Sequence, residues 1–259
     1  RKDAPEYSWK GVLPMMMNSE FDNLFQSLKK MRLSGMTEEL ERQYLDPNSD
    51  LLDPEERISR LIRAEFELRH TKKLNRLVKS SNIRYPQATI DQSIEDPKRN
   101  LDAATILKLA QCSWIQEKRN LIITGLTGAG KSWCACALGM AAMQKMYTVY
   151  YSSTEYLLQK LHSAVNTKEL MDQMDKLKKY DLLILDDFGL MNFDLDMCRN
   201  LFQLIDLREG RASMIIVSQY PVSEWYDLFS SHTYADATLD RLTSTAYRLE
   251  FKGESLRRR

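Results

Sequence analysis

Residues 125–132 have the types and spacing that bind the phosphates of a nucleotide. They match the pattern G-x-x-x-x-G-K-[S/T], in which glycines let the backbone turn its N–H groups inward, toward phosphate oxygens. The lysine adds positive charge for the β- and γ-phosphates, and the serine hydroxyl can bind Mg²⁺. The residues expected to bind ATP are Gly125, Leu126, Thr127, Gly128, Ala129, Gly130, Lys131, Ser132 and Trp133. A chance glycine loop is the alternative, but the apolar run before the motif and the alanine-rich helical run after it favour phosphate binding.

Two aspartates further along the chain could complete such a site. Asp186 and Asp187 directly follow the apolar run 182–185, so we expect them at the carboxyl end of a buried strand, beside the phosphate-binding loop. Asp186 would hold Mg²⁺ together with Ser132, and Asp187 would orient and polarise the attacking water. By themselves, two adjacent acids more often cap a helix or lie in a loop. Their place downstream of residues 125–132 favours the catalytic interpretation.

Gln219 and Arg241 complete the expected catalytic set, with Lys131 and Asp187. Gln219 closely follows the apolar run 214–217, where a polar side chain could report the state of the γ-phosphate. Ordinary polarity at a strand end is the alternative. Arg241 lies in a predicted helix over 236–242. It is either a surface residue or an arginine presented to the nucleotide of a neighbouring chain, where it would stabilise transition-state charge.

The elements that must position these residues alternate between strands and helices. Apolar or β-branched runs predict five strands, at 121–124, 147–151, 182–185, 214–217 and 247–251. Helical runs follow the phosphate-binding motif over 132–145, and recur over 154–179 and 198–208, with a shorter one at 103–114. This alternation predicts an α/β domain over 101–259, built on a five-stranded parallel sheet with the phosphate-binding loop at its edge.

The part of the chain before this domain is predicted to be helical and basic. Residues 19–84 have the periodicity of a small all-helical domain, in which Gly35 is expected to end the first helix. Between residues 55 and 84 there are nine Lys or Arg and four Asp or Glu. Such a run either contacts DNA phosphates or is a solvated helix face. Residues 85–100 contain two prolines and are expected to link the domains, and residues 1–18 are either an irregular native segment or a cloning remnant.

Composition excludes several other classes. Hydrophobic residues make up 43% of the 259 residues, and the net charge is +1, so a sizeable core is expected and global disorder is not. The chain has no apolar run long enough for a membrane span and no secretory signal. Its four cysteines have no C-x-x-C spacing, which makes a zinc site improbable and favours reduced thiols in a cytoplasmic protein.

Together, these residues resemble the IstB/DnaC family of AAA+ ATPases, and the IstB branch most closely. The C-terminal blocks 223–225, 235–242 and 253–257 are similar to that family's closing blocks, and so is the helical domain ahead of the ATPase. The resemblance implies a DNA-binding ATPase that assembles into ATP-dependent homo-oligomers and assists or targets an insertion-sequence transposase. It also implies that Gln219 is the sensor 1 residue, that Arg241 is an arginine finger acting on the adjacent protomer, and that Arg257 belongs to a second nucleotide-sensing block.

The sequence departs from the wider AAA+ pattern in several ways. Many AAA+ proteins have Glu where this chain has Asp187, so the rate of hydrolysis is open. Sensor 1 is often Asn where this chain has Gln219, Trp133 is a bulky residue after Ser132, and we expect no typical helical lid. Three alternatives therefore stand beside a transposition ATPase. They are a DnaC-type replicative helicase loader, a P-loop small-molecule kinase, and a nucleotide-bound scaffold that barely hydrolyses ATP.

Overall fold

The computed structural model describes residues 19–94, 102–164 and 166–252. The chain divides into two compact units, residues 1–73 and 74–259, and the division falls within helix α3 (Pro54–Ser80). The sequence placed this boundary later, at residues 84–85. Residues 1–18, the end of the expected linker and Arg257 lie outside the described residues.

The first unit is helical, with α1 (Ser19–Lys30), α2 (Ser34–Leu45), the 3₁₀ turn η3 (Ser49–Leu51) and the first part of α3. The sequence suggested that Gly35 ends the first helix. In the structure, Gly35 instead lies in the first turn of α2. A side chain there would collide with α3, because a Cβ would lie 2.6 Å from the carbonyl oxygen of Ala64. The Gly35 N–H donates to Glu65 Oε2 at 2.7 Å, so a carboxylate of α3 caps α2. The left-handed turn that separates α1 from α2 is at Arg32 instead.

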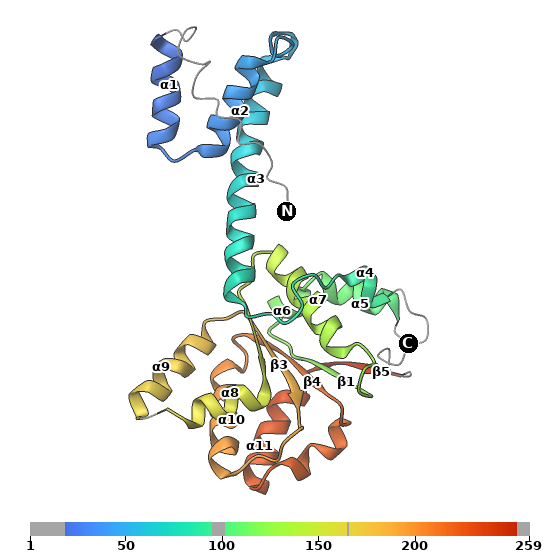
Figure 1. Ribbon diagram of the computed structural model, residues 1–259. Helices are drawn as coiled ribbons and strands as arrows, with labels where there is room; N and C mark the ends of the chain where they lie inside the picture. Colours follow the sequence, from blue (N-terminus) through green and yellow to red (C-terminus); the bar gives the residue numbers. More distant parts are fainter. Residues whose placement is uncertain (1–18, 95–101, 165, 253–259) are drawn as a thin grey trace, which may run out of the picture. The chain divides into compact units, whose positions relative to one another are not determined.

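The second unit is a three-layer α/β/α fold around a parallel sheet of five strands, as the sequence predicted (Figure 1). The strands are β1 (Leu121–Gly125), β2 (Val149–Ser153), β3 (Leu182–Phe188), β4 (Ser213–Ser218) and β5 (Tyr247–Phe251), in the order β2-β3-β4-β1-β5. Strand β4 therefore lies between β1, which leads into the phosphate-binding motif, and β3, which carries the two aspartates. All five strands are parallel, so their carboxyl ends meet at one edge of the sheet.

Helices cover both faces of this sheet (Figure 1). One face packs against α4 (Ile90–Ile94), α5 (Ala103–Ala110), α6 (Ser113–Gln116) and α7 (Lys131–Gln144). The other packs against α8 (Thr154–His162), α10 (Leu195–Arg208) and α11 (His232–Thr243), together with α9 (Thr167–Lys178) and the 3₁₀ turns η5 (Val222–Glu224) and η6 (Tyr226–Leu228). Alternate residues of β1 point to opposite faces: Ile122 belongs to one core, and Leu121 and Ile123 belong to the other.

The segment after α3 is packed on the second unit. Ile83, Tyr85, Ile90 and Ile94 lie against the core on the α7 side, with the last apolar residues of α3. The described part of the expected 85–100 linker thus belongs to the α/β unit. Tyr151 on β2 donates its backbone N–H to the carbonyl of Ser81 at 2.8 Å, which fixes the end of α3 against the sheet.

Candidate functional site

The phosphate-binding loop follows β1 and ends at the first turn of α7. Gly125 has φ +140°, and a Cβ there would lie 2.3 Å from the carbonyl oxygen of Phe251, so only glycine fits between β1 and the end of β5. Gly130 precedes α7 in the left-handed region, with φ +96°. Lys131 is buried and donates from Nζ to the carbonyl of Leu126 at 2.9 Å. The loop therefore places backbone amides, a lysine and the positive end of a helix at one point, which suits a polyphosphate.

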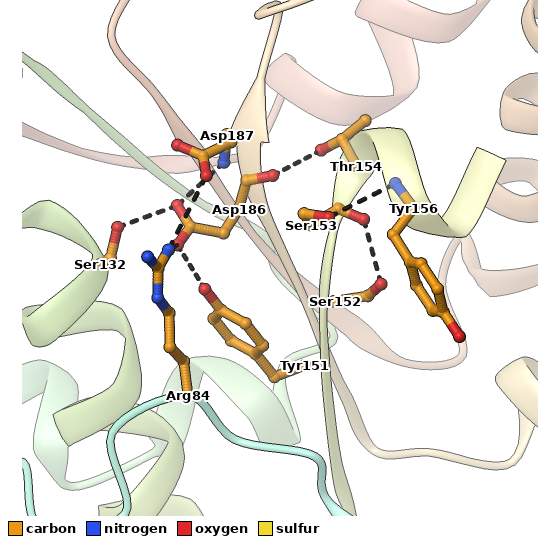
Figure 2. A network of polar contacts seen from close by, with 9 residues as sticks. All are labelled: Arg84, Ser132, Tyr151, Ser152, Ser153, Thr154, Tyr156, Asp186 and Asp187. Carbon is orange, nitrogen blue, oxygen red and sulfur yellow. Dashed lines mark hydrogen bonds and ion pairs between the residues drawn. The ribbon is translucent and has the colours of Figure 1, made fainter. Parts of the chain in front are cut away.

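Asp186 lies directly beside this loop, fully buried at the end of β3 (Figure 2). Ser132 donates from Oγ to Asp186 Oδ1 at 3.1 Å, across 54 positions of sequence. The backbone N–H of Asp187 donates to the same oxygen at 2.9 Å, and Thr154 Oγ1 donates to the Asp186 carbonyl at 2.9 Å. A hydroxyl and a carboxylate oxygen at this distance form a hard oxygen donor set, which fits Mg²⁺.

Asp187 has a backbone conformation that is unusual for a residue with a side chain. Its φ is +57°, and the pairing of β3 with β4 is irregular between Leu185 and Phe188. Left-handed backbone at a non-glycine residue costs about 1–3 kcal/mol and is concentrated at functional sites. Its side chain is 42% exposed, whereas that of Asp186 is 1% exposed. The two adjacent carboxylates thus have different environments, one buried beside Ser132 and the other open to solvent.

Gln219 follows β4 and contacts the phosphate-binding loop. Thr127 donates from Oγ1 to Gln219 Oε1, so the predicted sensor is joined to the predicted nucleotide loop. Ser218, beside it, is buried and donates from Oγ to the carbonyl of Phe188 at 2.6 Å. A pocket of about 380 Å³ adjoins Gln219, Leu126 and the end of β5. Because β4 lies between β1 and β3, a side chain at its end can contact both halves of the site.

Trp133 and Arg241 are placed differently. Trp133 is half-buried, and its ring lies 5.4 Å from that of Tyr85. Arg241 lies on α11, in the wall of a cavity of about 450 Å³ that also includes Asn120. Asn120 lies just before β1, and the phosphate-binding loop lies just after β1. The cavity, and Arg241 with it, is therefore at the end of the sheet opposite the nucleotide loop of the same chain. The structure therefore does not bring Arg241 to the phosphate-binding loop of its own chain.

Arg84 and Tyr151 belong to the site, although the sequence analysis did not single them out. Tyr151 donates its hydroxyl to Asp186 Oδ2 at 2.5 Å, and Arg84 Nη1 lies 3.9 Å from carboxylate oxygens of Asp186 and Asp187 (Figure 2). Burial, followed by the nearby Asp186 charge, raises the pKa of Tyr151. Hydrogen bonding with Tyr151 raises the pKa of Arg84. Arg84 was counted with the basic helix and Tyr151 with a strand, and nothing local in the sequence signals that they meet.

The four cysteines lie in the core. All four are free and buried, and burial raises the pKa of Cys112 and Cys136 to about 11. Within the described parts of the chain, no group of three or more His, Cys, Asp or Glu could hold a metal ion, and none of the helices has the length and apolar composition to cross a bilayer.

The family of IstB-like ATP-binding proteins matches residues 26–259 of this chain. The chain belongs to this family. It is 36% identical over 231 residues to an insertion sequence ATP-binding protein of Sinorhizobium fredii, covering 89% of this chain and 93% of that protein. It is 38% identical over 196 residues to the ATP-binding protein of insertion sequence IS1162 from Pseudomonas fluorescens, covering 76% of this chain and 85% of that protein. The expected IstB resemblance is thereby confirmed.

Solved structures confirm the fold. The DnaC helicase loader has a TM-score of 0.53 to this chain at 21% identity, covering 65% of this chain and 99% of that one. AMPPCP-bound DnaA from Aquifex aeolicus has a TM-score of 0.54 at 19% identity, covering 64% of this chain and 50% of that one. The α/β unit therefore has the same fold as the matching parts of these two proteins.

Proposed function

We propose that this protein is a DNA-binding ATPase that oligomerises on DNA and assists an insertion-sequence transposase in the cytoplasm. The observation that supports it most directly is the hydrogen bond between Ser132 and Asp186, which joins the phosphate-binding loop to the acidic end of β3. The insertion-sequence relatives point to a transposase as the partner. Bound ATP would supply the free energy that favours the assembled state, through its higher affinity for that state.

Each site residue has a role in this proposal. Backbone amides of residues 125–132 and Lys131 would bind the β- and γ-phosphates. Ser132 and Asp186 would hold Mg²⁺, which neutralises phosphate charge when bound. Asp187, half-exposed beside them, would orient the attacking water. Gln219 would sense the γ-phosphate through its contact with the loop.

Arg241 would complete the site of the adjacent protomer, because it lies away from the loop of its own chain. ATP hydrolysis would then depend on assembly, and the nucleotide would lie at the interface between two protomers.

The basic part of α3 is the proposed DNA contact. Five Lys or Arg residues are exposed between residues 69 and 79, and that stretch contains no acidic residue; they are Arg69, Lys72, Lys73, Arg76 and Lys79. Each phosphate neutralised on DNA releases counterions, so affinity falls steeply with salt. In an oligomer these weak contacts add through avidity.

Binding of a fluorescent DNA duplex tests this function, measured with ATP, with a non-hydrolysable ATP analogue and without nucleotide. We expect tight binding only with nucleotide, and a log–log salt slope near about −4.5 if five phosphates are contacted per binding unit. Lys131→Ala should abolish the nucleotide effect, whereas Asp187→Asn should keep DNA binding and lose phosphate release. Equal DNA affinity with and without nucleotide would refute the mechanism.

The same preparation addresses the alternatives. Phosphate release without any acceptor supports hydrolysis over a small-molecule kinase, and no turnover with DNA supports a static scaffold. The DnaC-type loader shares the fold, so the core does not discriminate against it. Capture assays with the transposase of the same insertion sequence and with a replicative helicase would decide between these two partners.

A further inference from the structure

Arg84 comes from the turn after α3, yet it reaches both aspartates of the candidate site. Its Nη1 lies 3.9 Å from Asp186 Oδ2 and 3.9 Å from Asp187 Oδ2. Figure 2 shows the guanidinium facing the two carboxylates, on the same side of Asp186 as the Tyr151 hydroxyl. Because the Asp186 side chain is only 1% exposed, its ionised form needs hydrogen bonds and a nearby positive charge. Arg84 supplies such a charge.

Hydrogen bonds of Tyr151 form a second connection between Asp186 and the turn at residues 81–84. Its backbone N–H donates to the Ser81 carbonyl at 2.8 Å, and its carbonyl accepts from Asn82 Nδ2 at 3.2 Å. Its hydroxyl donates to Asp186 Oδ2 at 2.5 Å. One residue of β2 thus joins the turn at the end of α3 to the carboxylate that would hold Mg²⁺.

A guanidinium and Mg²⁺ compete for these carboxylates. The Arg84 guanidinium and Mg²⁺ are both positive and repel each other at contact distances, and the divalent ion attracts the carboxylate oxygens more strongly. The Arg84 side chain is 46% exposed, so it can move away from the carboxylates without a large change in the core. Arrival of the metal with the nucleotide would therefore weaken the ion pairs of Arg84.

We propose that Arg84 is a positioning residue that neutralises Asp186 and Asp187 in the metal-free site and leaves them when Mg²⁺–nucleotide binds. The turn formed by residues 81–84 then responds to occupancy of the site. Since α3 continues from this turn into the helical unit, the turn is the chain connection through which nucleotide binding reaches the proposed DNA-binding helix. This inference rests on the proposed nucleotide site.

A magnesium titration of nucleotide binding tests the competition. A fluorescent ATP analogue is held at fixed concentration with the 259-residue chain while Mg²⁺ is raised from zero. In Arg84→Gln we expect the half-saturating Mg²⁺ concentration to fall about fivefold, the ratio for losing both ion pairs of Arg84, with Asp186 and with Asp187. Arg84→Lys keeps the charge and should restore the wild-type midpoint. Lys168→Gln removes one exposed positive charge from α9, at a residue with no role in the candidate site, and should leave the midpoint unchanged.

Hydrogen exchange tests the response of the turn. In the wild type, amides of residues 81–88 should exchange faster once Mg²⁺ and a non-hydrolysable ATP analogue are bound. In Arg84→Gln they should exchange at the faster rate already without ligand. Thermal melting of each variant shows whether it is folded.

The outcomes separate the two proposals. Wild-type protein that binds no nucleotide at any Mg²⁺ concentration overturns both. The role of Arg84 alone is overturned if nucleotide binding depends on Mg²⁺ but has the same midpoint in wild type and Arg84→Gln. It is also overturned if the hydrogen-exchange rates of residues 81–88 do not change when the ligand binds.

Discussion

Arg241 is held by acidic residues of its own chain, and releasing it should accelerate ATP hydrolysis. Its Nε lies 3.0 Å from Glu209 Oε2 and 3.3 Å from Asp206 Oδ1, and both acids are 51% exposed. The guanidinium also lies over the ring of Phe202, 5.0 Å from its centroid. An arginine that acts on a neighbouring nucleotide must give up these acidic partners first. The double variant Asp206→Asn, Glu209→Gln removes them while leaving Arg241 in place.

The size of the effect follows from the exposure of the two pairs. Half-exposed ion pairs contribute about 0.5 kcal/mol each, so together they favour the held state by about 1 kcal/mol. Their loss should raise the ratio of released to held Arg241 about fivefold. We therefore expect the double variant to hydrolyse ATP up to about fivefold faster at protein concentrations below saturation. Arg241→Ala should lower turnover by about 10³-fold or more and leave ATP binding intact.

Initial rates of phosphate release, measured over a range of protein concentrations with DNA present, check both expectations. Glu117→Gln is the matched control. Glu117 lines the same cavity and is also 51% exposed, but its ion-pair partner is Arg119, at 3.8 Å. A double variant no faster than the control, or an Arg241→Ala variant with the wild-type rate, would refute the role assigned to Arg241.

Two further substitutions test the fold that positions the site. Gly125→Ala should lower the free energy of unfolding by about 2–4 kcal/mol, and Tm by more than about 5 °C, because its Cβ would meet the Phe251 backbone. As a control, Gly210→Ala should lower the free energy of unfolding by only about 1 kcal/mol, since a Cβ there meets nothing within 4 Å. Burial opposes ionisation of Glu65, but hydrogen bonds from Arg69 and from backbone N–H groups of α2 lower its pKa. The stability that Glu65 contributes is therefore present above the unfolded-state pKa and lost as pH falls through the lower folded-state value. Urea denaturation should show Glu65→Gln about 1–2 kcal/mol less stable at pH 7, with a smaller difference below about pH 4.5.

Local sequence patterns were sufficient to predict the sheet and its two chemical segments. Each of the five strands was predicted within two or three residues of its observed ends, since buried parallel strands are continuous apolar runs. Gly35 shows where such reasoning fails. Glycine commonly follows a helix, but here it is needed for the close approach of α2 to Ala64 and Glu65 of α3. That requirement comes from residues about 30 positions away, so no local pattern contains it.

The same distinction explains which parts of the site were predicted. Lys131, Ser132 and Asp186 could be identified because each lies near the carboxyl end of a strand or shortly after it, and parallel strands bring their carboxyl ends together whatever the remaining side chains are. Arg84 reaches Asp186 only because the end of α3 is hydrogen-bonded to Tyr151 on β2, the strand paired with β3. Its role depends on packing, which a motif does not record. The phosphate-binding loop would bind phosphate, whereas the turn at residues 81–84 is connected both to the site and to α3. We therefore expect a response of the assembly to nucleotide to depend on the non-local contacts of Arg84 more than on the loop.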